Sequence, residues 1–199
     1  MPLNEIVSTY IRFFFILTPF FILAVFLSLT ESVSDADRRS LAIRVTAGIA
    51  VISLVMLFFG DLIFSLFGIT VDAFRIGAGA LLFLSAVSLV QGNFQLPKTK
   101  QSVLDLAIVP LAMPIALGPG AIGALLVMGS EAKGAVALAG TIAAVVAASV
   151  SVGAILLLSR QIMRLIGSSG ISMLSKVTGL FIAALSCQMM FAGAATFLK

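Results

Sequence analysis

The chain has 199 residues, of which 61% are apolar and only 10% are charged. Soluble domains are about 45 to 50% apolar and about 25% charged, so this composition leaves too few polar side chains to cover a water-soluble globule. There is no His and a single Cys, which excludes imidazole catalysis, histidine metal sites and an intrachain disulfide, and we expect no cofactor and no metal. The formal charge of +4 comes from scattered residues that form no continuous basic stripe, so we expect no nucleic-acid partner.

Six charge-free stretches predict membrane-spanning helices, each of which needs about 20 mainly apolar residues. In chain order they cover residues 13–30, 45–60 with an apolar extension to 67, 76–97, 106–130, 134–159 and 177–198. Their apolar residues fall on odd and even positions alike, which does not fit the strands of a β-barrel, and helices then satisfy the backbone in lipid. We therefore expect an all-α polytopic membrane protein with six transmembrane helices, folded as a single transmembrane domain over residues 1–199.

Short connectors separate these spans and predict their orientation. They comprise a charged, solvated turn at 31–44 with a helix N-cap at Ser34 or Asp35, a break at 68–70, a polar stretch at 97–101 and a Gly/Ser turn at 167–170. The first, third and fifth connectors carry eight Lys and Arg, and the opposite side carries four. Basic residues favour the cytoplasmic side, so both termini are expected outside, which is the periplasm for a bacterial inner membrane.

Prolines and glycines stand inside two of the predicted spans. Pro19 interrupts the first span, and the fourth contains Pro110, Pro114 and the run Gly118-Pro119-Gly120. An interior proline lacks an N–H and clashes with the carbonyl four residues back. Broken backbone at membrane depth is tolerated only inside protein or against a polar cavity. We therefore expect an unwound break at 118–120; a kinked helix without a functional role is the alternative.

A weak internal repeat supports the functional interpretation of these breaks. Pro19 and Pro119 lie 100 residues apart, as do Glu31 and Glu131, and a further two pairs lie 101 residues apart, Arg75 with Lys176 and Ser85 with Ser186. Halves of three spans each, about 1–97 and 98–199, would be inverted relative to each other in the membrane. Inverted repeats with broken helices in matching places, here helices 1 and 4, are typical of transporters whose site lies near the bilayer midplane.

The chemistry of a broken helix suggests what would bind there. The N-terminus of a half-helix offers N–H groups and a positive dipole end to a carboxylate, while freed carbonyls suit an ammonium group, so a small zwitterion fits both. The candidate binding residues are Thr18, Pro19, Pro114, Gly118, Pro119 and Gly120.

Two of the polar side chains have a structural alternative. The Thr18 hydroxyl either faces the site or bonds to a carbonyl of its own helix. Arg75 either forms an interfacial pair with Asp72 or acts as an ion partner or gate at the mouth of the cavity.

Several motifs in one order closely resemble the MarC-related family, which includes small neutral amino-acid transporters. They are FGI at 67–69, FRIGAG at 74–79, VPLAMP at 109–114, GPGAI at 118–122 and IMRLIG at 162–167. The resemblance covers nearly the whole chain and implies a six-span inner-membrane protein that moves alanine, glycine and similar solutes. Many members carry Asp-Pro or Asn-Pro in the first span, followed by a glycine and a second proline, where this chain has Thr18, Phe21 and Ala24.

Three functions compete at this point. A secondary transporter or facilitator for small neutral amino acids, with the solute and the lipid bilayer as its partners, is favoured by the paired breaks. A non-transporting scaffold or accessory subunit would instead have both breaks packed shut. An intramembrane enzyme would need a nucleophile and a base, and because the chain has no His and no Lys within a span, we expect no enzymatic activity.

Overall fold

The chain folds as a bundle of helices joined by turns, and the all-α prediction is confirmed. The computed structural model describes residues 3–31, 33–92 and 116–197, and within these ranges it contains no strand. The helices are α1 (Leu3–Ile16), α2 (Pro19–Leu29), α3 (Asp35–Phe67), α4 (Val71–Gln91), α5 (Pro119–Glu131), α6 (Ala135–Leu157) and α7 (Ser159–Phe197).

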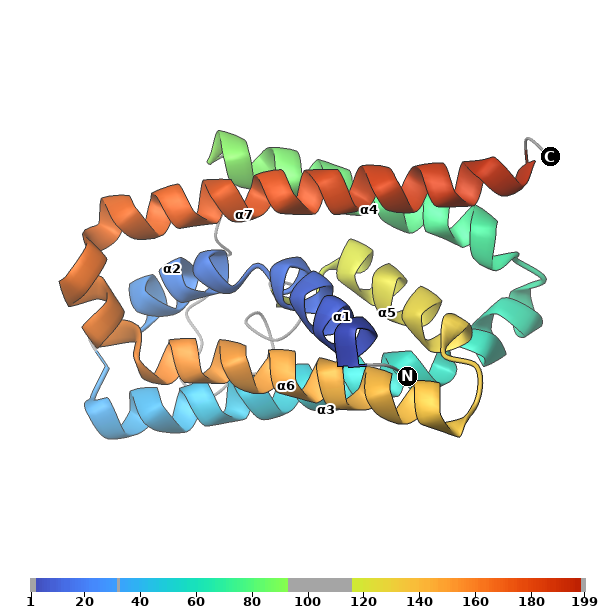
Figure 1. Cartoon of the computed structure of the whole chain (residues 1–199). Helices are drawn as coiled ribbons and strands as arrows, with labels where there is room; N and C mark the ends of the chain where they lie inside the picture. The colour runs from blue at the N-terminus through green and yellow to red at the C-terminus, as the bar shows by residue number, and fades with distance from the viewer. Residues whose placement is uncertain (1–2, 32, 93–115, 198–199) are drawn as a thin grey trace.

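The bundle has three layers (Figure 1). Helix α4 packs along α7 on one side, α3 packs along α6 on the other, and α1, α2 and α5 lie between these pairs. The two chain ends lie toward the same end of the bundle. The core between the layers is built from fully buried apolar side chains, among them Phe13, Phe26, Leu125, Val145 and Leu156. The short helices α2 and α5 thus lie between the long outer ones, where interrupted backbone can be sheltered from lipid.

Five helical segments in the described part of the chain are long and apolar enough to cross a membrane. They are Leu3–Leu29, Asp35–Phe59, Val71–Gln91, Ala135–Leu157 and Ser159–Thr196. Helix α5 has only 13 residues and cannot cross a bilayer alone. It covers the second half of the expected fourth span, whose first half, with Pro110 and Pro114, lies outside the described residues, as does the expected connector at 97–101.

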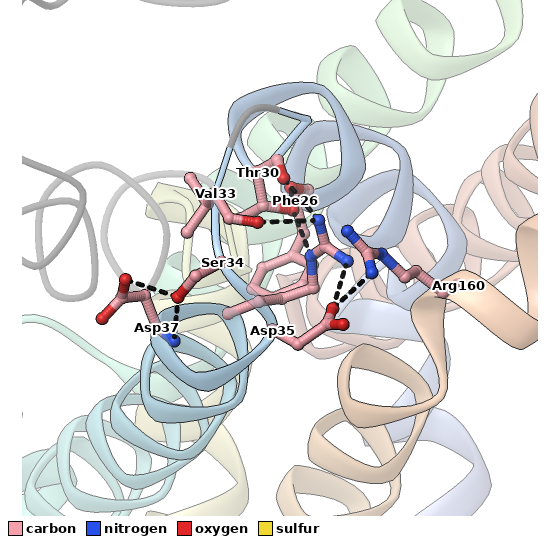
Figure 2. A network of polar contacts seen from close by, with 8 residues as sticks. Phe26, Thr30, Val33, Ser34, Asp35, Asp37 and Arg160 are labelled. Atoms are coloured by element: carbon pink, nitrogen blue, oxygen red, sulfur yellow. Dashed lines mark hydrogen bonds and ion pairs between the residues drawn. The ribbon is translucent and has the colours of Figure 1, made fainter.

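The expected charged turn at 31–44 is wrong for most of its length, because α3 already begins at Asp35. The helix starts where the sequence places a cap: the Ser34 hydroxyl accepts a hydrogen bond from the Asp37 N–H at 3.2 Å and donates to the Asp37 carboxylate (Figure 2). Acidic residues in the first turn also stabilise the helix N-terminus. The prediction of a cap at Ser34 is confirmed.

Other predicted boundaries also shift: α4 begins at Val71 rather than at residue 76, and α7 begins at Ser159 rather than at residue 177. The first helix begins at Leu3 rather than at residue 13, because Arg12 lies on an exposed face where a long side chain can reach the interface. Where a Gly/Ser turn was expected at 167–170, the structure has only a kink inside α7. Only Gly167 leaves the helical conformation, at φ 66° and ψ 175°, which glycine adopts without steric cost.

Candidate functional site

The first span is broken between α1 and α2, as the sequence predicts. Leu17 and Thr18 separate the two helices, and Pro19 is the first residue of α2. The Phe15 carbonyl, which Pro19 cannot pair with, instead accepts a hydrogen bond from the Thr18 N–H at 2.9 Å. The break therefore satisfies the backbone group that the proline would otherwise orphan.

Thr18 combines backbone strain with an unused hydroxyl. Its φ of 50° and ψ of 54° are left-handed, and it is the one non-glycine residue with positive φ in the described part of the chain. A β-branched residue in this region costs roughly 1–2 kcal/mol. Its hydroxyl oxygen is buried and has no hydrogen-bond partner among the described residues, so the alternative that it bonds to its own helix is wrong. Strained residues concentrate at functional sites, and an unsatisfied buried group requires an explanation.

The second break precedes α5 and is narrower than expected. Gly118 is extended at φ −66° and ψ 170°, whereas Pro119 and Gly120 already belong to the helix. The expected break at 118–120 is wrong for these two residues, because the fixed φ and missing N–H of proline suit the first position of a helix. Pro114, the remaining candidate from this span, lies outside the described residues.

Both breaks line one cavity of about 230 Å³. Its walls comprise Ile16, Thr18 and Phe21 from the first break, Ala116, Gly118, Pro119, Gly120 and Ala121 from the second, Leu82, Ser85 and Leu89 from α4, and Ile182 from α7. The structure therefore brings together four of the predicted binding residues, Thr18, Gly118, Pro119 and Gly120. Pro19 is buried beside the cavity without lining it. The walls from α4 and α7 were not predicted, since no local pattern marks them.

The size and charge of this cavity restrict what it can hold. Drug-sized ligands occupy pockets of about 300–1,000 Å³, so a cavity of about 230 Å³ suits a smaller solute. None of the lining residues that the structure describes is charged. The N-termini of α2 and α5 both adjoin it, and neither helix has a side-chain cap. Their positive dipole ends make the cavity a favourable place for an anionic group such as a carboxylate.

A second cavity of about 220 Å³ extends along α5 and shares Ile16 and Leu82 with the central one. At its far end Arg75 donates hydrogen bonds to Asp72 on its own helix and to Glu131 at the end of α5. The predicted pair with Asp72 is confirmed, and the contact with Glu131 was missed. Arg75 therefore ties α4 to the last residue of α5 beside the cavity.

A third cavity of about 590 Å³ lies along α2 toward the other end of the bundle. Four of its residues stand 100 positions before residues of the α5 cavity: Ala24, Leu27, Ser28 and Glu31 correspond to Ala124, Val127, Met128 and Glu131. In contrast to Glu131, Glu31 has no ion pair within the described ranges. Figure 1 shows α2 and α5 leaving the centre of the molecule toward opposite ends.

Comparison with known proteins places this architecture in a family. The model of the family described as MarC family integral membrane protein matches residues 3–198. The chain belongs to the MarC family. The resemblance seen in the sequence is thereby confirmed, and this MarC-family chain is an integral membrane protein.

Similar MarC-family relatives come from several bacteria. A UPF0056 membrane protein of Aquifex aeolicus is 32% identical over 97% of this chain and 94% of its own length. One from Buchnera aphidicola subsp. Baizongia pistaciae is 30% identical over 94% and 92%. The UPF0056 membrane protein YhcE of Escherichia coli is 29% identical over 92% and 89%. No solved structure matches the chain.

Proposed function

We propose that this protein is a secondary transporter or facilitator for small neutral amino acids or similar compact polar solutes across the inner membrane, with both termini in the periplasm. The observation that carries the proposal is the meeting of two half-helix N-termini at one small cavity. The helix ends and the unused Thr18 hydroxyl suit a carboxylate. The described part of the lining carries no charge, which suits a solute that is neutral overall.

An inverted repeat of two three-span halves would explain the paired cavities. In this arrangement α5 is the second half of the fourth of six spans, and α2 and α5 are equivalent half-helices of opposite direction. The matching positions along the α2 and α5 cavities support this arrangement. Each cavity would then be the path from one membrane face to a shared central site, which is the geometry needed for alternating access.

Arg75 acts as a gate in this scheme. Its contact with Glu131 spans the narrower path, while the wider path contains Glu31 without an ion pair. The structure then corresponds to a state closed toward the Arg75 end and more open toward the other. Transport requires the opposite state, in which the Arg75–Glu131 contact breaks.

The test replaces the Thr18 hydroxyl in purified protein reconstituted into proteoliposomes. Thr18→Val keeps the shape and removes the hydroxyl, and a lost hydrogen bond of about 1 kcal/mol predicts at least about fivefold slower uptake of labelled alanine or glycine. Thr18→Ser should retain transport. Thr46→Val is the matched control, because the Thr46 hydroxyl bonds to the Ala42 carbonyl of its own helix at 2.7 Å. Uptake by Thr18→Val equal to that of the control would remove the site assignment.

The scaffold alternative expects both breaks to be packed shut, whereas they line a cavity. Substituting Gly120 would be a poor test, because a Cβ there would lie 2.7 Å from the Leu82 backbone nitrogen and a folding defect would obscure the result. Thr18 avoids this problem.

A further inference from the structure

Four arginines gather at the end of the bundle where α3 and α7 begin. Arg38, Arg39, Arg160 and Arg164 line an open cavity of about 500 Å³, and Asp35 is the one acidic residue among its described lining residues. This cavity shares no lining residue with the central one between the helix breaks, but it adjoins the third cavity along α2, with which it shares Arg38, Arg160 and Arg164. An excess of positive charge in a hollow attracts anions.

Two of these arginines are occupied by structural contacts. The Arg38 side chain is largely buried and donates to the Thr30 carbonyl at 2.6 Å and to the Thr30 hydroxyl at 3.2 Å. Arg160 pairs with Asp35 at 2.5 Å, and Arg38 shares the same carboxylate oxygen. Figure 2 shows Thr30, Asp35 and Arg160 joined by one set of polar contacts, so this network links the end of α2 to the starts of α3 and α7.

The other donors in this cavity are unused. Arg39 and Arg164 are exposed, and neither has an ion pair or a hydrogen bond within the described ranges. Ser159 is 1% exposed, and its hydroxyl is buried without a hydrogen-bond partner. A buried unsatisfied hydroxyl is unusual and requires an explanation. The cavity therefore contains two free guanidinium groups and one unpartnered hydroxyl. A phosphate group can accept hydrogen bonds from all three.

We propose that this cavity binds a phosphate group, and that its source is the headgroup of an anionic phospholipid. Leu157 lines the cavity at 46% exposure, and Leu158 and Leu165, which adjoin lining residues in the sequence, are 51% and 86% exposed. Apolar surface next to a basic pocket on a membrane protein suits acyl chains attached to an anionic headgroup. Inorganic phosphate shares the headgroup chemistry but would gain nothing from these leucines.

The experiment uses the full-length protein in detergent with three probes: phosphatidylglycerol, phosphatidylcholine and inorganic phosphate. Lipid retention in native mass spectrometry gives the affinity, and the melting temperature gives the stabilisation. Phosphatidylglycerol should bind and raise the melting temperature, and phosphatidylcholine should not. Arg39→Gln/Arg164→Gln should bind phosphatidylglycerol about 25-fold more weakly, about fivefold for each arginine. Arg44→Gln/Lys133→Gln removes the same charge from exposed residues outside the cavity and should change the affinity by less than about twofold.

Ser159→Ala separates binding from folding. It should weaken phosphatidylglycerol binding about fivefold, while the melting temperature without lipid stays equal or rises because an unsatisfied buried hydroxyl is removed. Equal protection of the wild type by phosphatidylcholine, or full protection of the double arginine variant by phosphatidylglycerol, would overturn the proposal. Protection by inorganic phosphate as strong as that by phosphatidylglycerol would support the phosphate site but overturn the lipid as its source.

Discussion

Helices α2 and α5 begin in the same way but from different backbone conformations. Each starts at a proline, and in each the fourth residue donates to the carbonyl before the proline at 3.0 Å: Ile22 to Thr18 and Ile122 to Gly118. Thr18 is nevertheless left-handed, whereas Gly118 is extended as the residue before a proline usually is. The strained position thus carries the bulkier residue. The proline starts the second helix in both places, while the conformation before it follows from the surroundings.

The two half-helices also differ in how they pack. Helix α5 approaches its neighbours through Gly120, Gly123 and Gly129, where an added Cβ would clash with Leu82, Ala78 and the Leu57 carbonyl respectively. The positions 100 residues earlier, in α2, hold Phe20, Leu23 and Leu29. Helix α5 is therefore held by close approach of its backbone to α3 and α4, and α2 by its side chains. We expect α5 to tolerate added volume less well.

Gly129→Ala should have the largest effect. Its Cβ would overlap the Leu57 carbonyl oxygen, and backbone of α3 cannot yield as a flexible side chain can. Overpacking of this kind typically costs 1–3 kcal/mol, and we expect at least about 2 kcal/mol here. Thermal unfolding in detergent measures it. Gly77→Ala is the control, because nothing lies within 4 Å of the added atom. Equal melting temperatures for the two variants would show that α5 is not held by its backbone.

Local features of this molecule were predictable, and contacts between distant segments were not. The helical class, the break at Pro19 and the Ser34 cap follow from composition or from a few adjacent residues. The left-handed backbone of Thr18 does not, because nothing in its neighbours favours it over the extended form. The Arg75 contact with Glu131 joins residues 56 positions apart. Likewise, Arg38 is buried because it donates to Thr30, the residue at which α2 ends. The sequence does not show this contact, so the charge of Arg38 predicted a solvated turn.

Thr18→Gly tests the strain at the first break. Glycine adopts positive φ freely, so relief of the backbone strain should raise the free energy of unfolding by roughly 0.5 to 1 kcal/mol. The same change at Thr46, inside α3, should lower it by at least roughly 0.3 kcal/mol, because glycine is a poorer helix former than threonine. Thermal unfolding of both variants in detergent gives the comparison. If Thr18→Gly destabilises as much as Thr46→Gly, the left-handed conformation of Thr18 is not strained. The conformational difference between Thr18 and Gly118 would then not affect the free energy of unfolding.

The smallest expected effect compares the two carboxylates at the ends of α2 and α5. Glu131 pairs with Arg75, but it is 50% exposed, so Glu131→Gln should cost no more than about 1 kcal/mol. Glu31→Gln should cost nothing measurable, because Glu31 has no ion pair in the described part of the chain. Melting temperatures at low and high salt separate the cases, since screening weakens only an existing pair and should shrink the Glu131→Gln difference. Equal, salt-dependent losses for both variants would mean that both ends are closed by ion pairs, and the proposed difference between a closed and an open path would be lost.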